Sequence, residues 1–158
     1  MRLNRAWIET HIPHQGRMCL LDEVIDWDTE HISCRTTTHR ATDNPLRSQS
    51  GLGIACGIEY AAQAMALHGA MVSGAASDAG DDVEERKPDV GFLASVRDVR
   101  LFVRRLDDIG SDLICEATLL AGDGLTALYG FVLREGERRL LSGRASVVLD
   151  SAKHTRYE

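Results

Sequence analysis

One stretch of the chain is apolar on nearly every side, and it predicts a long helix that is buried all round. It runs from residue 52 to 72 and reads LGIACGIEYAAQAMALHGAMV. A surface helix would instead show a single apolar stripe. Alanine, glycine and methionine dominate the stretch, so a sheet could pack closely around it. Three polar side chains interrupt it, Glu59, Gln63 and His68.

The first two of these polar residues mark a candidate site. Glu59 and Gln63 are four residues apart and share one face of the helix, whereas His68 points elsewhere. Burying a carboxylate costs free energy, and a functional site is one common reason to keep one. The alternative is a carboxylate that is hydrogen-bonded at a subunit interface, and the helix pattern alone leaves both interpretations open.

The rest of the chain shows the shorter apolar runs and alternation that are typical of strands. A short helix is predicted at 4–10, and a hairpin is predicted from strands at 18–27 and 31–40. The short separators GDG and REGE indicate further hairpins. Four more strands are predicted at 90–103, 112–121, 125–134 and 138–149. This order predicts an α+β hotdog fold, an antiparallel sheet of about six strands wrapped around one buried helix. The open edge of such a sheet usually implies a dimer.

Length and composition fit a single domain over residues 1–158. Apolar residues make up 44% and charged residues 27% of the chain, which are globular values. The small, acidic stretch at about 74–89 is predicted to be a flexible excursion, and residues 150–158 a tail.

Charge and cysteine usage narrow the possible partners and the compartment. The net charge of −6 provides no general attraction to nucleic acid or anionic lipid. Arginines are nonetheless dense at 97–105 and 134–144, as a solvated strand face or, alternatively, as a docking patch for an acidic partner or a phosphate. The four cysteines lack metal-like spacing and suggest reduced thiols in a cytoplasmic protein. The polar residues within the long helix argue against a membrane span.

Three segments resemble the FabZ/FabA-type 3-hydroxyacyl-acyl carrier protein dehydratases. Residues 12–17 (IPHQGR) and 19–24 (CLLDEV) resemble the family's opening. Residues 57–64 (GIEYAAQA) resemble its central-helix motif, an acidic residue followed four positions later by glutamine. The start of the third strand is similar at 91–97 (GFLASVR). The sequence around Glu59 especially resembles that of the dehydratase-like hotdog proteins of aryl polyene gene clusters.

The resemblance implies dehydration of 3-hydroxyacyl thioesters on acyl carrier protein or coenzyme A, in fatty acid or polyene-type biosynthesis. It implies Glu59 as the catalytic carboxylate, with a pKa that burial would raise. Amides near Gly53 and Ile54, at the positive end of the helix, would polarise the thioester carbonyl. Gln63 would orient Glu59 or water, and His14 would line the site entrance; for both, a purely structural role is the alternative. No metal or other cofactor is expected.

The chain departs from the family at one catalytic position. Counting back from Glu59 puts Pro45 where the family has a loop histidine, and the nearest histidine is His39. In the family, this histidine and the helix carboxylate come from two chains. We therefore expect a homodimer with little activity, or a heterodimer that a histidine-bearing hotdog partner completes. A hotdog thioesterase that uses Glu59 and a non-catalytic acyl-binding subunit are the alternatives.

Overall fold

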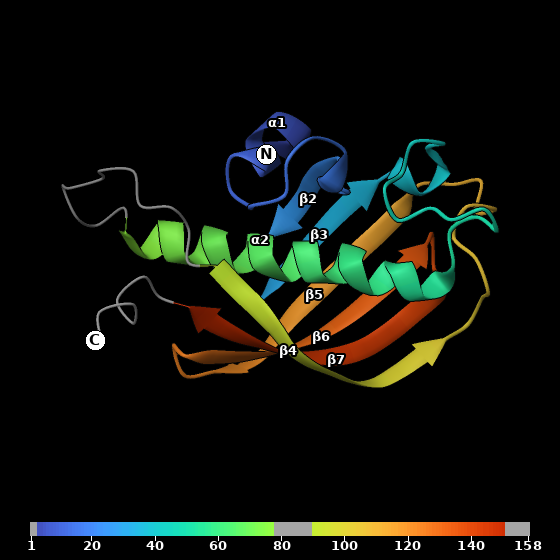
Figure 1. Ribbon diagram of the computed structural model, residues 1–158. Helices are drawn as coiled ribbons and strands as arrows, with labels where there is room; N and C mark the ends of the chain where they lie inside the picture. Colours follow the sequence, from blue (N-terminus) through green and yellow to red (C-terminus); the bar gives the residue numbers. More distant parts are fainter. Residues whose placement is uncertain (1–2, 78–89, 151–158) are drawn as a thin grey trace, which may run out of the picture.

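The structure, a computed structural model, describes residues 3–77 and 90–150, which form one antiparallel sheet around one long helix (Figure 1). The described part of the sheet has seven strands in the order β1-β2-β3-β5-β6-β7-β4. In chain order the elements are β1 (Leu3–Asn4), α1 (Arg5–Glu9), β2 (Glu23–Trp27), β3 (His31–Thr36), α2 (Gly57–Ser77), β4 (Val90–Leu101), β5 (Leu113–Gly122), β6 (Thr126–Glu135) and β7 (Arg138–Asp150). Short 3-10 helices lie at Gly16–Met18, Thr38–Arg40 and Ile54–Cys56. The predicted α+β architecture is confirmed.

Local turn chemistry sets the hairpins. The Asp28 carboxylate accepts the N–H groups of Glu30 and His31, both at 2.8 Å, and closes the turn between β2 and β3. Gly124 and Gly136 lie in the two later hairpin turns with positive φ angles of 87° and 53°, which glycine adopts without steric cost. All three predicted hairpins are therefore confirmed.

One face of the sheet is apolar and packs against α2. Every second residue of β6 is buried, and Tyr129 and Leu133 belong to this set. A side chain at Gly57, the first residue of α2, would lie within 2.8–2.9 Å of Leu133 and Leu141, so the start of the helix sits directly on the sheet. The alternation sends the intervening residues to the outer face, away from α2.

The ends of α2 differ from the prediction. The helix begins at Gly57, after the 3-10 helix of Ile54–Cys56, because residues 52–53 are extended and pair with the chain near Arg105. It continues to Ser77, so the start of the acidic excursion was predicted too early. Residues 78–89 and 151–158 lie outside the described residues. Among the described helices, none is long and apolar enough to cross a membrane.

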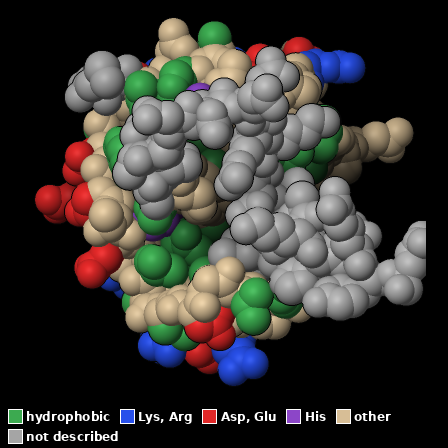
Figure 2. Space-filling model, turned by 90° about the vertical axis from the view of Figure 1, so that its left-hand side faces the viewer, with side chains coloured by type: hydrophobic (Ala, Val, Ile, Leu, Met, Phe, Trp, Pro, Cys, Tyr) green, Lys and Arg blue, Asp and Glu red, His purple; other side chains and the backbone are tan. Residues whose placement is uncertain are grey.

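The helix is also less buried than the sequence suggested. Ile58, Ala62, Ala66 and Gly69 form a half-exposed stripe along α2, spaced three or four residues apart. The stripe is apolar, so the single chain leaves part of the central helix for another surface to cover. Apolar side chains also gather at the surface on the end of the molecule shown in Figure 2, with charged side chains mostly at its margin.

The first two strands are shorter than predicted, and one strand was missed. Strand β2 begins only at Glu23, because residues 19–22 form neither helix nor strand, and β3 ends at Thr36, before the 3-10 helix at 38–40. The missed strand, β1, has two residues and pairs with β2 through Leu3 and Val24. Two residues are too few for periodicity to reveal.

Candidate active site

The loop between α1 and β2 is held against the start of α2 by a buried amide. Gln63 is fully buried, and its side-chain oxygen accepts the N–H of Leu20 at 2.8 Å. Its nitrogen donates to the carbonyl of Met18 at 2.7 Å. From the other side, Arg5 donates to the carbonyl of Gly16 at 2.9 Å. These contacts fix the position of the loop that carries His14.

His14 lies beside Glu59. The histidine Nε2 is 3.3 Å from Glu59 Oε1, and the two side chains are 27% and 38% exposed. Glu59 occupies the first turn of α2, one helical turn before Gln63. The structure therefore brings together three residues predicted from the sequence. Glu59 and His14 are partly exposed to solvent, whereas Gln63 is buried.

The pKa of Glu59 is lowered overall, so the predicted upward shift is wrong. The hydrogen bond from His14 holds the pKa of Glu59 below its ordinary value, and the amide of Gln63 adds a smaller effect in the same direction. Burial acts in the opposite direction but is outweighed. Glu59 is accordingly ionised at neutral pH and can accept a proton.

The other ring nitrogen of His14 has a different environment. Nδ1 is buried and has no hydrogen-bond partner among the described residues. Because Nε2 faces a carboxylate, Nε2 is assigned a proton in the neutral ring as well as in the imidazolium, and only the imidazolium can give that proton away and remain a neutral ring. The imidazole therefore exchanges protons on the side of Glu59.

The two predicted backbone donors at the start of the helix differ in availability. The N–H of Ile54 donates to the carbonyl of Arg104 at 3.0 Å, and the Ile54 side chain is part of the core. It is therefore not free to bind a substrate oxygen. Gly53 is exposed, the space beside it is open, and none of the hydrogen bonds of the described residues uses its N–H.

Asp107, which the sequence analysis missed, fixes the segment before the helix. Its side chain is 4% exposed, accepts the N–H of Leu52 at 3.0 Å and forms an ion pair with Arg105. A side chain at Gly51, where φ is 103°, would come within 2.5 Å of the Asp107 carboxylate. Only glycine fits this turn. The sequence signal was weak, because Asp107 lies in a separator that resembles an ordinary polar turn.

The remaining histidines do not serve Glu59. His39 is fully buried and donates to the carbonyl of Ile109 at 3.0 Å. His68 accepts from Tyr129 at 2.8 Å and donates to the Asp28 carbonyl at 2.9 Å, so it is a satisfied core histidine. The histidine that the structure places beside Glu59 is His14, which comes from the loop before β2 and not from the segment before α2.

A curved antiparallel sheet around one central helix defines the class of hotdog-fold proteins. A family model described as ApeP dehydratase matches residues 6–156, and the chain belongs to this dehydratase family. A comparison with curated proteins by sequence finds no match.

Solved structures agree on the fold. The chain is similar to one from Xenorhabdus doucetiae described as the dehydratase heterocomplex ApeI:P, with a TM-score of 0.75 and 24% identity over 94% of this chain and 93% of that chain. A putative thioesterase from Syntrophus aciditrophicus has a TM-score of 0.58 and 14% identity over 80% and 82% of the two chains. A thioesterase from Haemophilus influenzae has the same TM-score with 10% identity over 85% and 82%. At these identities the likeness shows the hotdog fold alone.

Proposed function

We propose that this protein is a subunit of a 3-hydroxyacyl thioester dehydratase in which Glu59 and His14 form the acid/base pair. The observation that carries the proposal is the 3.3 Å contact between Glu59 Oε1 and His14 Nε2 in a chain of the dehydratase family. The Asp or Glu and the His of such a pair supply the two proton transfers that dehydration needs.

The chemistry balances within this pair. The Glu59 carboxylate removes a proton from C2 of the acyl group, and the C2–H electrons form the C2–C3 double bond as the C3–O bond breaks. His14, as the imidazolium paired with the Glu59 carboxylate, gives its Nε2 proton to the departing hydroxyl, which leaves as water, and His14 is left as a neutral imidazole. Transfer of the proton from Glu59 to His14 across their contact restores the starting state. The lowered pKa of Glu59 supports its role as the base.

Two further residues complete the proposed site. The free N–H of Gly53 polarises the thioester carbonyl and stabilises the enolate-like oxygen that develops as the proton leaves. Gln63 positions rather than reacts, because its amide is committed to Leu20 and Met18. Ile54 contributes core packing instead of a backbone donor.

The protein works in this proposal as part of a hotdog dimer, with a second copy or a related partner. The half-exposed apolar stripe on α2 supports a covering partner, and the similar chain from Xenorhabdus doucetiae is described as part of a heterocomplex. The acyl group is carried on acyl carrier protein or coenzyme A.

The test is to incubate the purified protein with a 3-hydroxyacyl thioester and with the saturated acyl thioester of the same length, each on both carriers. The reactions are run with and without a co-encoded hotdog protein. Enoyl product that disappears with Glu59→Gln supports the dehydratase. Free thiol without enoyl product would instead indicate a thioesterase, and neither product would indicate a non-catalytic subunit.

A further inference from the structure

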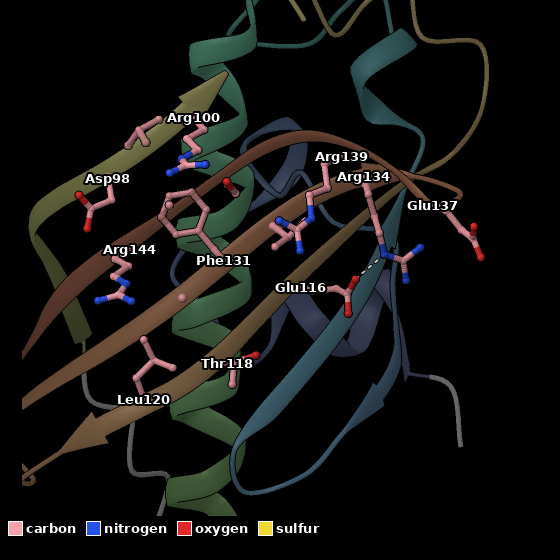
Figure 3. Close-up of a pocket in the computed structure, with 15 residues that line it drawn as sticks. Asp98, Arg100, Glu116, Thr118, Leu120, Phe131, Arg134, Glu137, Arg139 and Arg144 are labelled. Atoms are coloured by element: carbon pink, nitrogen blue, oxygen red, sulfur yellow. Dashed lines mark hydrogen bonds and ion pairs between the residues drawn. The ribbon is translucent and has the colours of Figure 1, made fainter. Parts of the chain in front are cut away.

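A groove crosses the outer face of the sheet, on the side away from α2 (Figure 3). It has a volume of about 860 Å³ and is lined by residues of β4, β5, β6 and β7. Its floor includes Gly130 and Val132 of β6, whose partners across the ladder in β7 are Arg144 and Ser142. These residues alternate with the buried positions that face the helix. The groove is therefore separate from the Glu59–His14 site.

Arginines dominate the walls of this groove. Arg134 is paired with Glu116, as the dashed line in Figure 3 marks. The other three, Arg100, Arg139 and Arg144, form no ion pair with any described residue. The two remaining acids of the lining, Asp98 and Glu137, lie at opposite ends of the groove. The lining thus holds four arginines and three acids, a net charge of +1, and three of its guanidinium groups form no ion pair with a described residue, in a protein whose net charge is −6.

The side chains that line the groove indicate which class of ligand it could bind. Guanidinium groups present paired N–H donors that match the oxygens of phosphate groups. Leu120 and Val99, which are 50% and 36% exposed, add apolar surface to the same lining. The volume lies within the range of small-molecule sites and exceeds what one inorganic anion fills. An anionic head and an organic body are both accommodated.

We propose that this groove binds an organic diphosphate ester of about nucleoside diphosphate size. The phosphates contact Arg100, Arg139 and Arg144 above the open floor at Gly130, and the organic part lies against Leu120. The site is independent of the proposed dehydratase function, so a test of ligand binding in the groove does not depend on the outcome of a test of dehydratase activity.

The experiment measures binding of metal-free ADP, and separately of inorganic pyrophosphate, to the full chain by titration calorimetry at fixed ionic strength. Two variants remove charge from the groove, Arg139→Gln and Arg144→Gln. Arg138→Gln is the matched control, because Arg138 is the exposed neighbour of Arg139, pairs with Glu135 and does not line the groove. Gly130→Val keeps every charge but fills the floor. It should fold, since the first added carbon would lie no closer than 3.7 Å to Leu120.

We expect saturable binding of ADP at one site, weakened about tenfold or more by each groove variant, Gly130→Val included, and unchanged in Arg138→Gln. If pyrophosphate binds as tightly as ADP, the groove recognises the diphosphate group alone. If pyrophosphate binds more weakly than ADP, the organic part of the ester contributes to binding. Absence of ADP binding would overturn the proposal. Equal losses in Arg138→Gln, or full affinity in folded Gly130→Val, would also overturn it, because attraction would then depend on general charge rather than on this groove.

Discussion

The pKa of Glu59 depends on a neighbouring side chain as well as on burial. His14 donates to it, and that hydrogen bond outweighs the desolvation that would otherwise raise its pKa. In the proposed dehydratase, a base that is ionised at neutral pH and an acid within 3.3 Å would each move one proton. On that proposal, a chain without the family's usual loop histidine keeps two proton-transfer groups.

The pH dependence of turnover should reveal this contact. His14→Gln removes the Coulombic attraction of His14 and replaces its hydrogen bond by that of a neutral amide, so burial is opposed less strongly and the pKa of Glu59 should rise. The acidic limb of the pH–rate profile reports ionisation of the base and should therefore move to higher pH, with a loss of turnover of about 10²–10⁴-fold. His11→Gln is the control, since His11 stacks on Trp7 in the preceding segment. An unmoved acidic limb in His14→Gln would contradict the assignment.

The sequence revealed part of this site and concealed the rest for physical reasons. Glu59 and Gln63 stand out because polar residues are rare in an apolar helix. The position of His14 depends on a loop folding back onto α2, and no periodicity reports such a contact. Only its place in a family-like motif indicated it, and then as an entrance residue. The pKa of Glu59 was mispredicted for the same reason, since burial was visible in the pattern and the donor was not.

At the scale of elements, a single side chain joins the opening loop to the central helix. Gln63→Met keeps the volume but leaves the N–H of Leu20 and the carbonyl of Met18 without their partner. We expect the free energy of unfolding to fall by about 1–3 kcal/mol, and turnover to fall further because His14 is no longer held. Denaturant unfolding and kinetics measure the two effects. Arg17→Met, at an exposed position of the same loop, should change neither by a comparable amount.

The segment before α2 depends in the same way on Asp107. Asp107→Ala removes the acceptor of the Leu52 N–H and the partner of Arg105, and should cost about 1–3 kcal/mol in the free energy of unfolding. The adjacent and exposed Asp108→Ala should cost little. Equal effects in chemical denaturation would show that the contact does not stabilise this segment.

Asp107 also predicts how stability responds to acid. Arg105 holds the pKa of Asp107 below its ordinary value of 3.8. Its stabilising contribution is therefore present above the pKa of an unfolded aspartate and is lost as the pH falls through the lower folded value. Asp107→Ala should remove this part of the acid dependence.

Element boundaries were harder to predict than element types. The hairpin strands 112–121, 125–134 and 138–149 were placed to within a residue, because Gly124 and Gly136 punctuate them. The first hairpin was predicted too long, since residues 19–21 are as apolar as a strand without forming one, and the threonines at 36–38 continue the β-like composition into a 3-10 helix. The start of α2 was placed five residues early, because residues 52–56 are as apolar as the helix itself.

At the scale of the whole molecule, the exposed stripe on α2 predicts association. The apolar residues Ile58, Ala62, Ala66 and Gly69 would be left half in water in a lone chain. We expect a dimer at micromolar concentration, with itself or with a hotdog partner, by light scattering. Ala62→Glu should shift the mass toward the monomer, whereas Ala55→Glu, exposed in the segment before the helix, should not. A monomeric wild-type protein, alone and with the partner, would contradict this.

The most direct test concerns the pair itself, in whichever assembly is active. Glu59→Gln and His14→Gln are introduced into this chain only, any partner is left unchanged, and enoyl formation from a 3-hydroxyacyl thioester is measured alongside thermal stability. The account predicts that both variants fold and that turnover falls by about 10²-fold or more in each, with Glu59→Gln at the lower level. Full turnover in a folded Glu59→Gln or His14→Gln protein would show that the proton transfers are made elsewhere.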